Sequence, residues 1–386
     1  MACRAYGEAV IGYCAVTLVG FSHGKTLTYY ICVILHHEYH ILPTKLLGTG
    51  AGIFKECRSP AKSFVLLALV MSQTIFYSDV SVLVAAHRGT STLDACLRLL
   101  ANQSFSGSWE VVLCDDGSNG DVLDLANPIF KNGPMDFRYV WQPRNGERRS
   151  HSRNNGLRCA RGRIVILLDG DIAVGPEFVR NHVDAHRDTS NSKTAVYGTR
   201  KWIFDNQLSA FSSREEIARQ VAVGAGPVVK LYSDFDYQQR FANTQYAWLG
   251  CFGCNLSFVR EAEVFFDEQF LGWGSEDQEF ACRLYLRHGY QLLFRPMIYG
   301  FHFEPGGIDD FCPVRPNTHP DIVQYLRNML HFRDSYSELD MTLACVGAAY
   351  YVLNTETQLW ERRHRPMFNR KYIHRMLETA AAEARK

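Results

Sequence analysis

The sequence has 386 residues, of which 47% are hydrophobic and 21% are charged, and its 41 Lys and Arg balance 40 Asp and Glu. This composition is typical of a globular protein of one large or two ordinary domains, and it excludes a wholly disordered or collagen-like chain. The net charge of +1 argues against a dedicated nucleic-acid binder, which would show a basic excess. The 12 cysteines are scattered without the spacing of a disulfide framework, so we expect reduced thiols and a cytoplasmic location.

The first 70 residues differ from the rest of the chain and are assigned to an N-terminal extension, 1–78, of uncertain structure. Its two longest apolar runs, 9–21 and 26–35, are each shorter than the ~20 residues of a membrane-spanning helix. No segment has the arrangement of a secretory signal. Because Met71 lies shortly before the first convincing strand, one hypothesis is that the native chain starts there.

From residue 80 onward, apolar runs of strand length alternate with helical patterns, which predicts βαβ units around a mainly parallel sheet. Residues 164–168 are all apolar, as in a strand that is covered on both faces. The expected elements are strands at 80–85, 110–114, 137–141, 163–168 and 291–294, and helices at 91–103 (capped by Ser91), 121–130, 152–161, 276–288 (capped by Ser275 with Gln278, ended by Gly289), 320–335 and 371–385. The fold class is therefore α/β, with a Rossmann-like sheet flanked by helices and a helical C-terminal extension.

Polar residues follow the predicted strand ends at three places. These are His87 with Arg88, Asp115 with Asp116, and Asp169-Gly170-Asp171. Because ligands bind at the carboxyl ends of the strands in open α/β sheets, we expect these residues to line one site. Asp169 and Asp171 offer hard oxygen ligands that suit Mg²⁺ or Mn²⁺. A plain Asp-Gly turn would look the same, and a second Asp-x-Asp occurs at 234–236.

Arginines crowd the stretch 144–163, and Arg153 is the best placed because it lies at the start of its predicted helix. A diphosphate needs charge-assisted donors of this kind. A solvated helix face explains the more distal arginines.

A second cluster, Gly272-Trp273-Gly274-Ser275-Glu276-Asp277, leads into a predicted helix. The two carboxylates could simply favour the positive helix end, which would lower their pKa values. A general base there needs burial or the neighbouring carboxylate to offset this effect. Trp273 could stack on a sugar ring or pack in the core.

His302 lies between aromatic residues and could complete a metal shell with Asp171, because imidazole suits Mn²⁺. Cys251 and Cys254 have the spacing of a redox pair or half a zinc site, but no second cysteine pair matches them. We expect these two thiols to pack in the core.

The order of these motifs resembles the family 2 glycosyltransferases with the GT-A fold, over about residues 80–305. The segments that carry the resemblance are Ser81-Val82-Leu83-Val84, Asp115-Asp116-Gly117-Ser118, Ser152-Arg153-Asn154-Asn155-Gly156 and Leu168-Asp169-Gly170-Asp171. Phe266-Asp267-Glu268 together with 272–277 is similar to the acceptor-side motif of β-galactosyl-, N-acetylgalactosaminyl- and chondroitin-polymerase-type members. One departure is that the family's Pro-x-Tyr/Phe-Asn reads Ala85-Ala86-His87-Arg88 here, so His87 stands where the family has the Tyr or Phe that stacks on the base.

The resemblance implies a role for each candidate residue. Binding of the nucleotide sugar falls to Ala85, His87, Asp116, Arg153, Asp169 and Gly170. A Mn²⁺ or Mg²⁺ cofactor is held by Asp171 and His302, with Asp169 near the metal-bound water. Asp277 matches the catalytic base, Glu276 matches a carboxylate that positions the acceptor, and Trp273 lies on the acceptor side.

The implied function is metal-dependent, inverting transfer of a sugar from a UDP-sugar to a hydroxyl of a saccharide, glycan or glycoconjugate. A retaining GT-A transferase is the alternative. A sugar nucleotidyltransferase is less favoured because 85–90 is not a Gly-rich phosphate loop, and a non-catalytic carbohydrate-binding protein has no need of a metal-phosphate site.

The expected glycosyltransferase domain is 79–310, with a nucleotide half at 79–171 and an acceptor half at 172–310. The resemblance ends after Pro305, and 311–386 forms the helical C-terminal extension. This extension could cover the acceptor groove, pair subunits or touch the cytoplasmic face of a membrane through 362–365.

Overall fold

The computed structural model of the chain describes four strands between residues 4 and 42 and then residues 78–383, apart from 132, 134, 190, 205–231, 307–311, 313, 315 and 364. The chain divides into two compact units, Met1–Thr74 and Ile75–Lys386.

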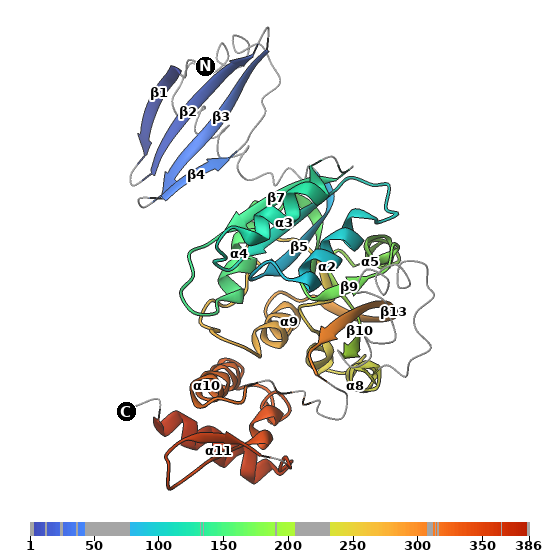
Figure 1. The fold of residues 1–386 in the computed structure, drawn as a ribbon, viewed down its shortest axis with the longest axis vertical. Coiled ribbons are helices and arrows are strands. Elements are labelled where there is room, and N and C mark those ends of the chain that lie inside the picture. The colour runs from blue at the N-terminus through green and yellow to red at the C-terminus, as the bar shows by residue number, and fades with distance from the viewer. Residues whose placement is uncertain are drawn as a thin grey trace. The chain divides into compact units, whose positions relative to one another are not determined.

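In the first unit, four strands form an antiparallel sheet in chain order (Figure 1). They are β1 (Arg4–Ile11), β2 (Cys14–His23), β3 (Thr26–Leu35) and β4 (Glu38–Leu42). The apolar runs at 9–21 and 26–35 therefore contribute to strands. Among the helices that the structure describes, none is long and apolar enough to cross a membrane. Met71, the hypothetical start, lies outside the described residues.

The second unit is built on a mixed sheet with the strand order β7-β6-β5-β8-β12-β10-β13-β9, and β11 pairs with β10. The strands are β5 (Ser78–Ala86), β6 (Trp109–Asp115), β7 (Asp136–Trp141), β8 (Gly162–Asp169), β9 (Ile172–Val174), β10 (Thr194–Phe204), β11 (Tyr232–Ser233), β12 (Leu256–Val259) and β13 (Gln291–Glu304). The expected parallel pairing is confirmed for β7, β6, β5 and β8. The other half is mixed, because β12 runs antiparallel to β8 and β10, and β9 runs antiparallel to β13.

Among the described α-helices, those at Phe178–Arg187 and Phe235–Phe241 were not predicted from the sequence, and the others lie close to where the periodicity predicts them. The described helices are α2 (Ser91–Ala101), α3 (Asp121–Phe130), α4 (Arg149–Cys159), α5 (Phe178–Arg187), α8 (Phe235–Phe241), α9 (Glu276–Leu286), α10 (His319–Ser335) and α11 (Arg370–Glu383), with 3-10 helices at Ala247–Gly250 and Val346–Tyr350 and a small hairpin of β14 (Tyr351–Leu353) and β15 (Trp360–Arg362).

Two predicted helix caps are wrong. The side chain of Thr90, and not that of Ser91, accepts the Leu93 N–H at 3.1 Å. Ser275 has a φ of +72° and makes no side-chain cap bond, so its predicted capping box with Gln278 does not form. Loop geometry has therefore overridden the local sequence pattern at Ser275.

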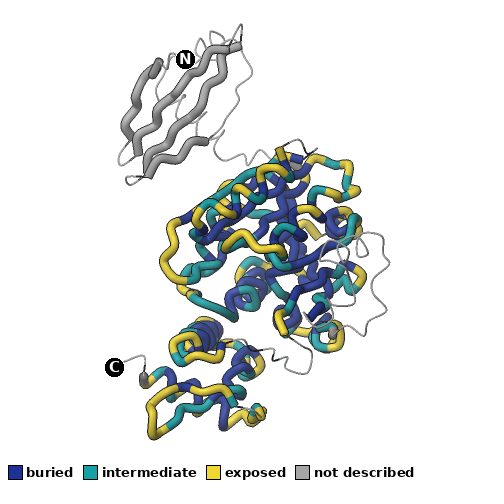
Figure 2. Tube along the Cα trace, viewed as in Figure 1, coloured by how far each residue is buried: buried dark blue, intermediate teal, exposed yellow. Residues whose placement is uncertain are grey.

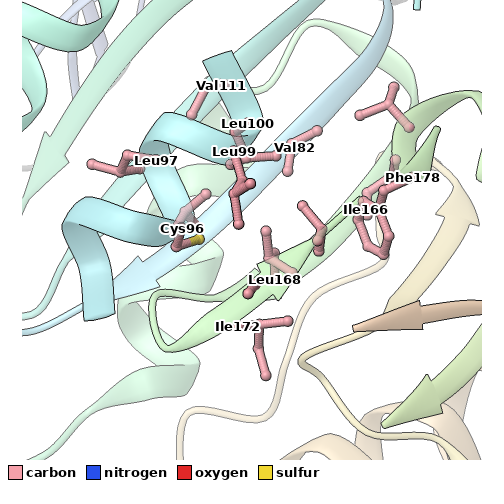
Figure 3. Close-up of a cluster of buried hydrophobic side chains, with 14 of the residues drawn as sticks. Val82, Cys96, Leu97, Leu99, Leu100, Val111, Ile166, Leu168, Ile172 and Phe178 are labelled. Atoms are coloured by element: carbon pink, nitrogen blue, oxygen red, sulfur yellow. The ribbon is translucent and has the colours of Figure 1, made fainter. Parts of the chain in front are cut away.

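The central strand β8 is buried on both faces, as its apolar run predicts. Ile164, Ile166 and Leu168 belong to one hydrophobic cluster, and Val165 and Leu167 belong to another on the opposite face. Figure 3 shows part of the first cluster, in which side chains of α2 and β5 meet those of β8. In Figure 2 the strands of this sheet are mostly dark blue, which marks them as buried.

A third hydrophobic cluster lies in the C-terminal extension. It joins α10 and α11 with the β14–β15 hairpin, through residues such as Leu326, Trp360 and Leu377. The extension therefore has an apolar core of its own beside the sheet unit.

One buried charge ties three segments of the sheet together. Glu110 on β6 is fully buried, and its carboxylate accepts hydrogen bonds from Ser81 Oγ at 2.7 Å, Arg138 Nε at 2.7 Å and the Arg161 N–H at 2.6 Å. Removal of one partner of such a network leaves the other buried polar groups without their partner.

We expect Glu110→Ala to lower the free energy of unfolding by about 2–4 kcal/mol, because the Ser81 hydroxyl and Arg138 Nε lose their acceptor. Urea denaturation measures this change. The reference substitution is Asp94→Ala, which removes a surface pair with Arg98 that is 55% exposed on the arginine side. It should cost no more than about 0.5 kcal/mol. Equal losses for the two variants would contradict the network's importance.

Candidate active site

One cavity of about 510 Å³ lies where β5, β6 and β8 end and where α4 and α9 begin. Its lining includes every residue to which the resemblance assigns a role, namely Ala85, His87, Asp116, Arg153, Asp169, Gly170, Asp171, Trp273, Glu276, Asp277 and His302, whereas Asp115, which was also expected to line the site, does not. Asp171 and Asp277, which come from segments more than a hundred residues apart, thus face a shared hollow.

The turns after β5, β6 and β8 are joined by backbone hydrogen bonds. The Asp116 N–H donates to Ala86 O at 3.0 Å, and the Gly170 N–H donates to Ala85 O at 2.9 Å. A Cβ on Gly170 would lie 2.8 Å from Leu93 Cδ1, so a side chain there would push the turn away from α2.

Asp115 and Asp116 have different surroundings although they are adjacent. Asp116 lines the cavity, and its carboxylate accepts from Gln142 Nε2 at 2.6 Å, Arg144 Nη1 at 2.8 Å and the Arg148 N–H at 2.8 Å. Asp115 is buried away from the cavity lining, where it binds Ser118 and Tyr139. Asp115 therefore holds the turn, and Asp116 is the carboxylate of the pair that faces the cavity.

Arg153 lies between the two halves of the cavity and is only 2% exposed. It donates to Asp169 Oδ1 at 2.7 Å and to Glu276 Oε1 at 3.2 Å, and its guanidinium lies over the Phe266 ring at 5.4 Å. These carboxylates outweigh burial and raise the pKa of Arg153, while Arg153 and Arg149 lower the pKa of Asp169 against burial. Both Asp169 and Arg153 are thus charged at neutral pH.

Asp277 lies in the first turn of α9, where Gly253 N–H and Gln278 N–H bind its two oxygens at 3.1 and 2.8 Å. Burial and then the charge of Glu276 raise the pKa of Asp277 to about 6, although the hydrogen bonds from the Gly253 and Gln278 N–H groups and the charge of Arg153 act to lower it. A Cβ on Gly253 would lie 3.2 Å from both Asp277 Cβ and Arg153 Nη2, so glycine lets the backbone come this close. A carboxylate with such a pKa can accept a proton near neutral pH.

His302 is brought to Asp171 by strand pairing. On β13, His302 pairs with Ile172 of β9, and its Nε2 lies 3.4 Å from Asp171 Oδ2. The Trp202 ring of β10 lies 4.5 Å from the imidazole, and Glu304 Oε2 lies 3.6 Å from its other nitrogen. A carboxylate behind a histidine is the usual arrangement that orients a metal-binding imidazole.

The donor set at Asp171 and His302 fits a divalent cation. Neighbouring ligands of an octahedral Mg²⁺ or Mn²⁺ ion lie roughly 3 Å apart, which is close to the separation of these two donor atoms. Among the described residues, no group of three such side chains is close enough to hold an ion alone. The remaining positions would therefore be filled by water or by oxygens of a ligand.

Several residues of the cavity lining were not predicted from the sequence. They include Arg200 and Trp202 on β10, Phe252, Glu304 and Tyr325. Arg200 lies 4.0 Å over the Phe252 ring and pairs with Asp234 at 2.7 Å. The first Asp of the second Asp-x-Asp thus holds an arginine of the cavity lining. The only signal for Glu304 was its period-two spacing from His302 on one strand.

Two other expectations concern packing. Trp273 lines the cavity and also contacts Tyr325 of α10, with the ring centres 5.1 Å apart. Cys251 and Cys254 are buried free thiols whose pKa values are raised by burial, which agrees with their predicted packing role.

Comparison with known proteins identifies related sequences. The profile of glycosyl transferase family 2 matches residues 81–263. Hyaluronan synthase of Pasteurella multocida is 30% identical over 59% of this chain and 25% of its own length, and chondroitin synthase of Escherichia coli is 28% identical over 60% and 36%. The chain thus spans about a quarter to a third of these relatives. A solved mannosyltransferase, PcManGT from Pyrobaculum calidifontis, aligns over 84% of this chain and 82% of its own, at 13% identity and a TM-score of 0.47.

The raised pKa of Asp277 predicts a pH dependence of stability. The folded protein holds a proton on Asp277 up to about pH 6, whereas an unfolded Asp titrates near ~3.9. Stability that protonation provides is therefore complete below pH ~4 and is lost as the pH rises to about 6. The unfolding free energy of Asp277→Asn minus that of the wild type should rise across this window and level off above it. Urea denaturation from pH 4 to 8 measures the difference, and a flat difference would contradict the assignment.

Proposed function

Because the profile of glycosyl transferase family 2 matches residues 81–263, we propose that the chain is a glycosyltransferase of the GT-A fold, which transfers a sugar from a UDP-sugar to an acceptor hydroxyl with inversion. The observation that carries the proposal is the shared cavity, in which the pair Asp171 and His302 faces the same hollow as Asp277. Such a transfer needs a cation beside the leaving diphosphate and a base beside the attacking hydroxyl, on opposite sides of one anomeric carbon.

We assign the donor end of the cavity to the turns after β5, β6 and β8. Asp116 and the backbone at Ala85 to His87 hold the uridine, and Arg153, Asp169 and Gly170 lie beside its ribose and diphosphate. Burial, with the nearby Arg144, lowers the pKa of His87, so its imidazole is neutral at physiological pH. A neutral imidazole offers a flat face to the base where the family has an aromatic ring.

We assign a Mn²⁺ or Mg²⁺ ion to Asp171 and His302, with Asp169 close by but already engaged by Arg153. When bound, such an ion would supply positive charge that stabilises the diphosphate leaving group. The Glu304 carboxylate, 3.6 Å from Nδ1 on the far side of the imidazole, places negative charge behind His302 and favours a ring orientation in which Nε2 faces the ion.

We assign the proton transfer to Asp277. In its ionised form it takes the proton of the acceptor hydroxyl as that oxygen attacks the anomeric carbon from the face opposite the leaving diphosphate. Glu276, which pairs with Arg153, positions the acceptor, and Trp273 offers an apolar face to the sugar ring. The pKa near 6 keeps Asp277 mostly unprotonated at neutral pH while it remains a usable base.

The related synthases are named for hyaluronan and chondroitin. On that ground we propose a saccharide or glycoconjugate acceptor. The direct test is a panel of UDP-hexoses, UDP-hexosamines and UDP-hexuronic acids with p-nitrophenyl glycosides as acceptors. UDP release follows turnover, and NMR of the product gives its anomeric configuration. An inverted product supports the proposal, and a retained configuration favours the retaining alternative.

We expect Asp277→Asn to lower the rate of transfer by about 10²–10⁴-fold, because an amide cannot accept the proton. Titration calorimetry should show UDP binding within about threefold of the wild type, since the donor end is unchanged. Asp321→Asn, which changes an exposed carboxylate in the first turn of α10, is the matched control and should keep full activity. Retained turnover in the Asp277 variant would refute its role as base.

We expect Asp171→Asn and His302→Ala to weaken UDP binding only in the presence of Mn²⁺. Calorimetric titrations with Mn²⁺ and with EDTA separate the two conditions. The wild type should gain at least about tenfold in affinity from the metal, and the two variants should lose that gain. Asp236→Asn in the other Asp-x-Asp, at an exposed position, should behave as wild type. A metal effect that persists in both cavity variants would place the ion elsewhere.

A further inference from the structure

Helix α10 lies beyond the segment that matches the family profile and belongs to the C-terminal extension. One face of it, formed by Gln324, Tyr325, Asn328 and His331, meets the acceptor segment 267–275. The positions 324, 328 and 331 have the i, i+4, i+7 spacing of a single helix face. The side chains of α10 that contact the acceptor segment therefore lie on one face of the helix.

The acceptor segment has an unusual backbone just before Asp277. Gly272, Gly274 and Ser275 have φ values of +66°, +100° and +72°. The left-handed conformation of Ser275 is sterically unfavourable, and its side chain makes no cap hydrogen bond that would compensate for it. Such a loop keeps its shape only when its surroundings hold it.

The side chain of Asn328 holds this loop in its shape. It is 2% exposed, and its Nδ2 donates to Leu271 O at 2.8 Å and to Gly274 O at 3.0 Å. Its Oδ1 accepts from Gln324 Nε2 at 3.1 Å, which fixes the orientation of the amide. One side chain thus binds the carbonyls at both ends of the short loop that carries Trp273.

The loop glycines fit against the same helix face. A Cβ on Gly274 would lie 2.5 Å from Tyr325 Cε2, and a Cβ on Gly272 would lie 3.0 Å from Gln324 Cγ. Tyr325 also contacts the Trp273 ring and itself lines the cavity. The wall on this side of the cavity is therefore shared between the loop and α10.

A second tie lies one turn further along α10. His331 Nε2 is 2.7 Å from Asp267 Oδ2, at the other end of the acceptor segment. The helix thus holds the segment at residue 267 and again at 271–274.

We propose that α10 is the acceptor platform of the enzyme, with Asn328 as a positioning residue that sets Trp273 for the acceptor, and Tyr325 as part of the acceptor wall. This inference rests on the proposed function. Of the three roles open to the C-terminal extension, it selects the covering of the acceptor groove.

The test uses the full chain and compares Asn328→Ala with Arg327→Ala, a neighbouring exposed residue of the same helix. The probes are the UDP-sugar that wild type hydrolyses fastest and the p-nitrophenyl glycoside that it glycosylates best. We expect Asn328→Ala to raise the acceptor KM at least tenfold while UDP affinity and hydrolysis of the donor by water stay within twofold. Hydrogen exchange of the 271–275 amides should become faster in this variant and stay unchanged in Arg327→Ala.

His331→Ala is a second test variant, which should disturb folding less than Asn328→Ala because His331 is partly exposed. It should raise the acceptor KM about threefold with donor hydrolysis unchanged. Equal losses of hydrolysis and transfer in the Asn328 variant, or an acceptor KM equal to that of Arg327→Ala, would overturn the inference. A wild-type protein that turns over no UDP-sugar would instead defeat the proposed function itself.

Discussion

The arrangement of the cavity depends on the buried guanidinium of Arg153. It binds Asp169 at the end of β8 and Glu276 at the start of α9, two segments that are 107 residues apart in the chain. A buried arginine without such partners would cost several kcal/mol, and so would either carboxylate alone. The three charges therefore stabilise one another only when the end of β8 and the start of α9 come together, and this requirement brings Asp171 and Asp277 to the lining of the same cavity.

Much of this arrangement could be predicted from the sequence, because it follows from local patterns. The apolar runs predict β5, β6 and β8, and parallel strands deliver their carboxyl ends to one edge. Asp116, Asp169 and Asp171 are found in this way. Arg200 and Trp202 could not be found, because their place in the lining depends on the register between β10 and β13, which includes an irregularity after Gly198. Long-range register leaves no local trace in the sequence.

Asp277 shows why local rules can mislead at a functional site. A position in the first turn of a helix predicts a lowered pKa. The folded chain instead removes this carboxylate from bulk solvent and places Glu276 beside it, and these two effects outweigh the hydrogen bonds from Gly253 and Gln278 and the charge of Arg153. Ser275 is similar, because its sequence pattern predicts a cap whereas its left-handed backbone is imposed by the loop that α10 holds. At both positions tertiary contacts decide the outcome, and the sequence alone does not contain their strengths.

If a cation and a base share one cavity, anomalous diffraction from crystals soaked with Mn²⁺ and UDP will show it most directly. We expect a manganese peak within about 2.5 Å of Asp171 and His302, beside the diphosphate and in the same cavity as Asp277. A peak or a nucleotide bound elsewhere, for example in the cavity of about 420 Å³ lined by Arg333, Asp340 and Arg370, would contradict this expectation.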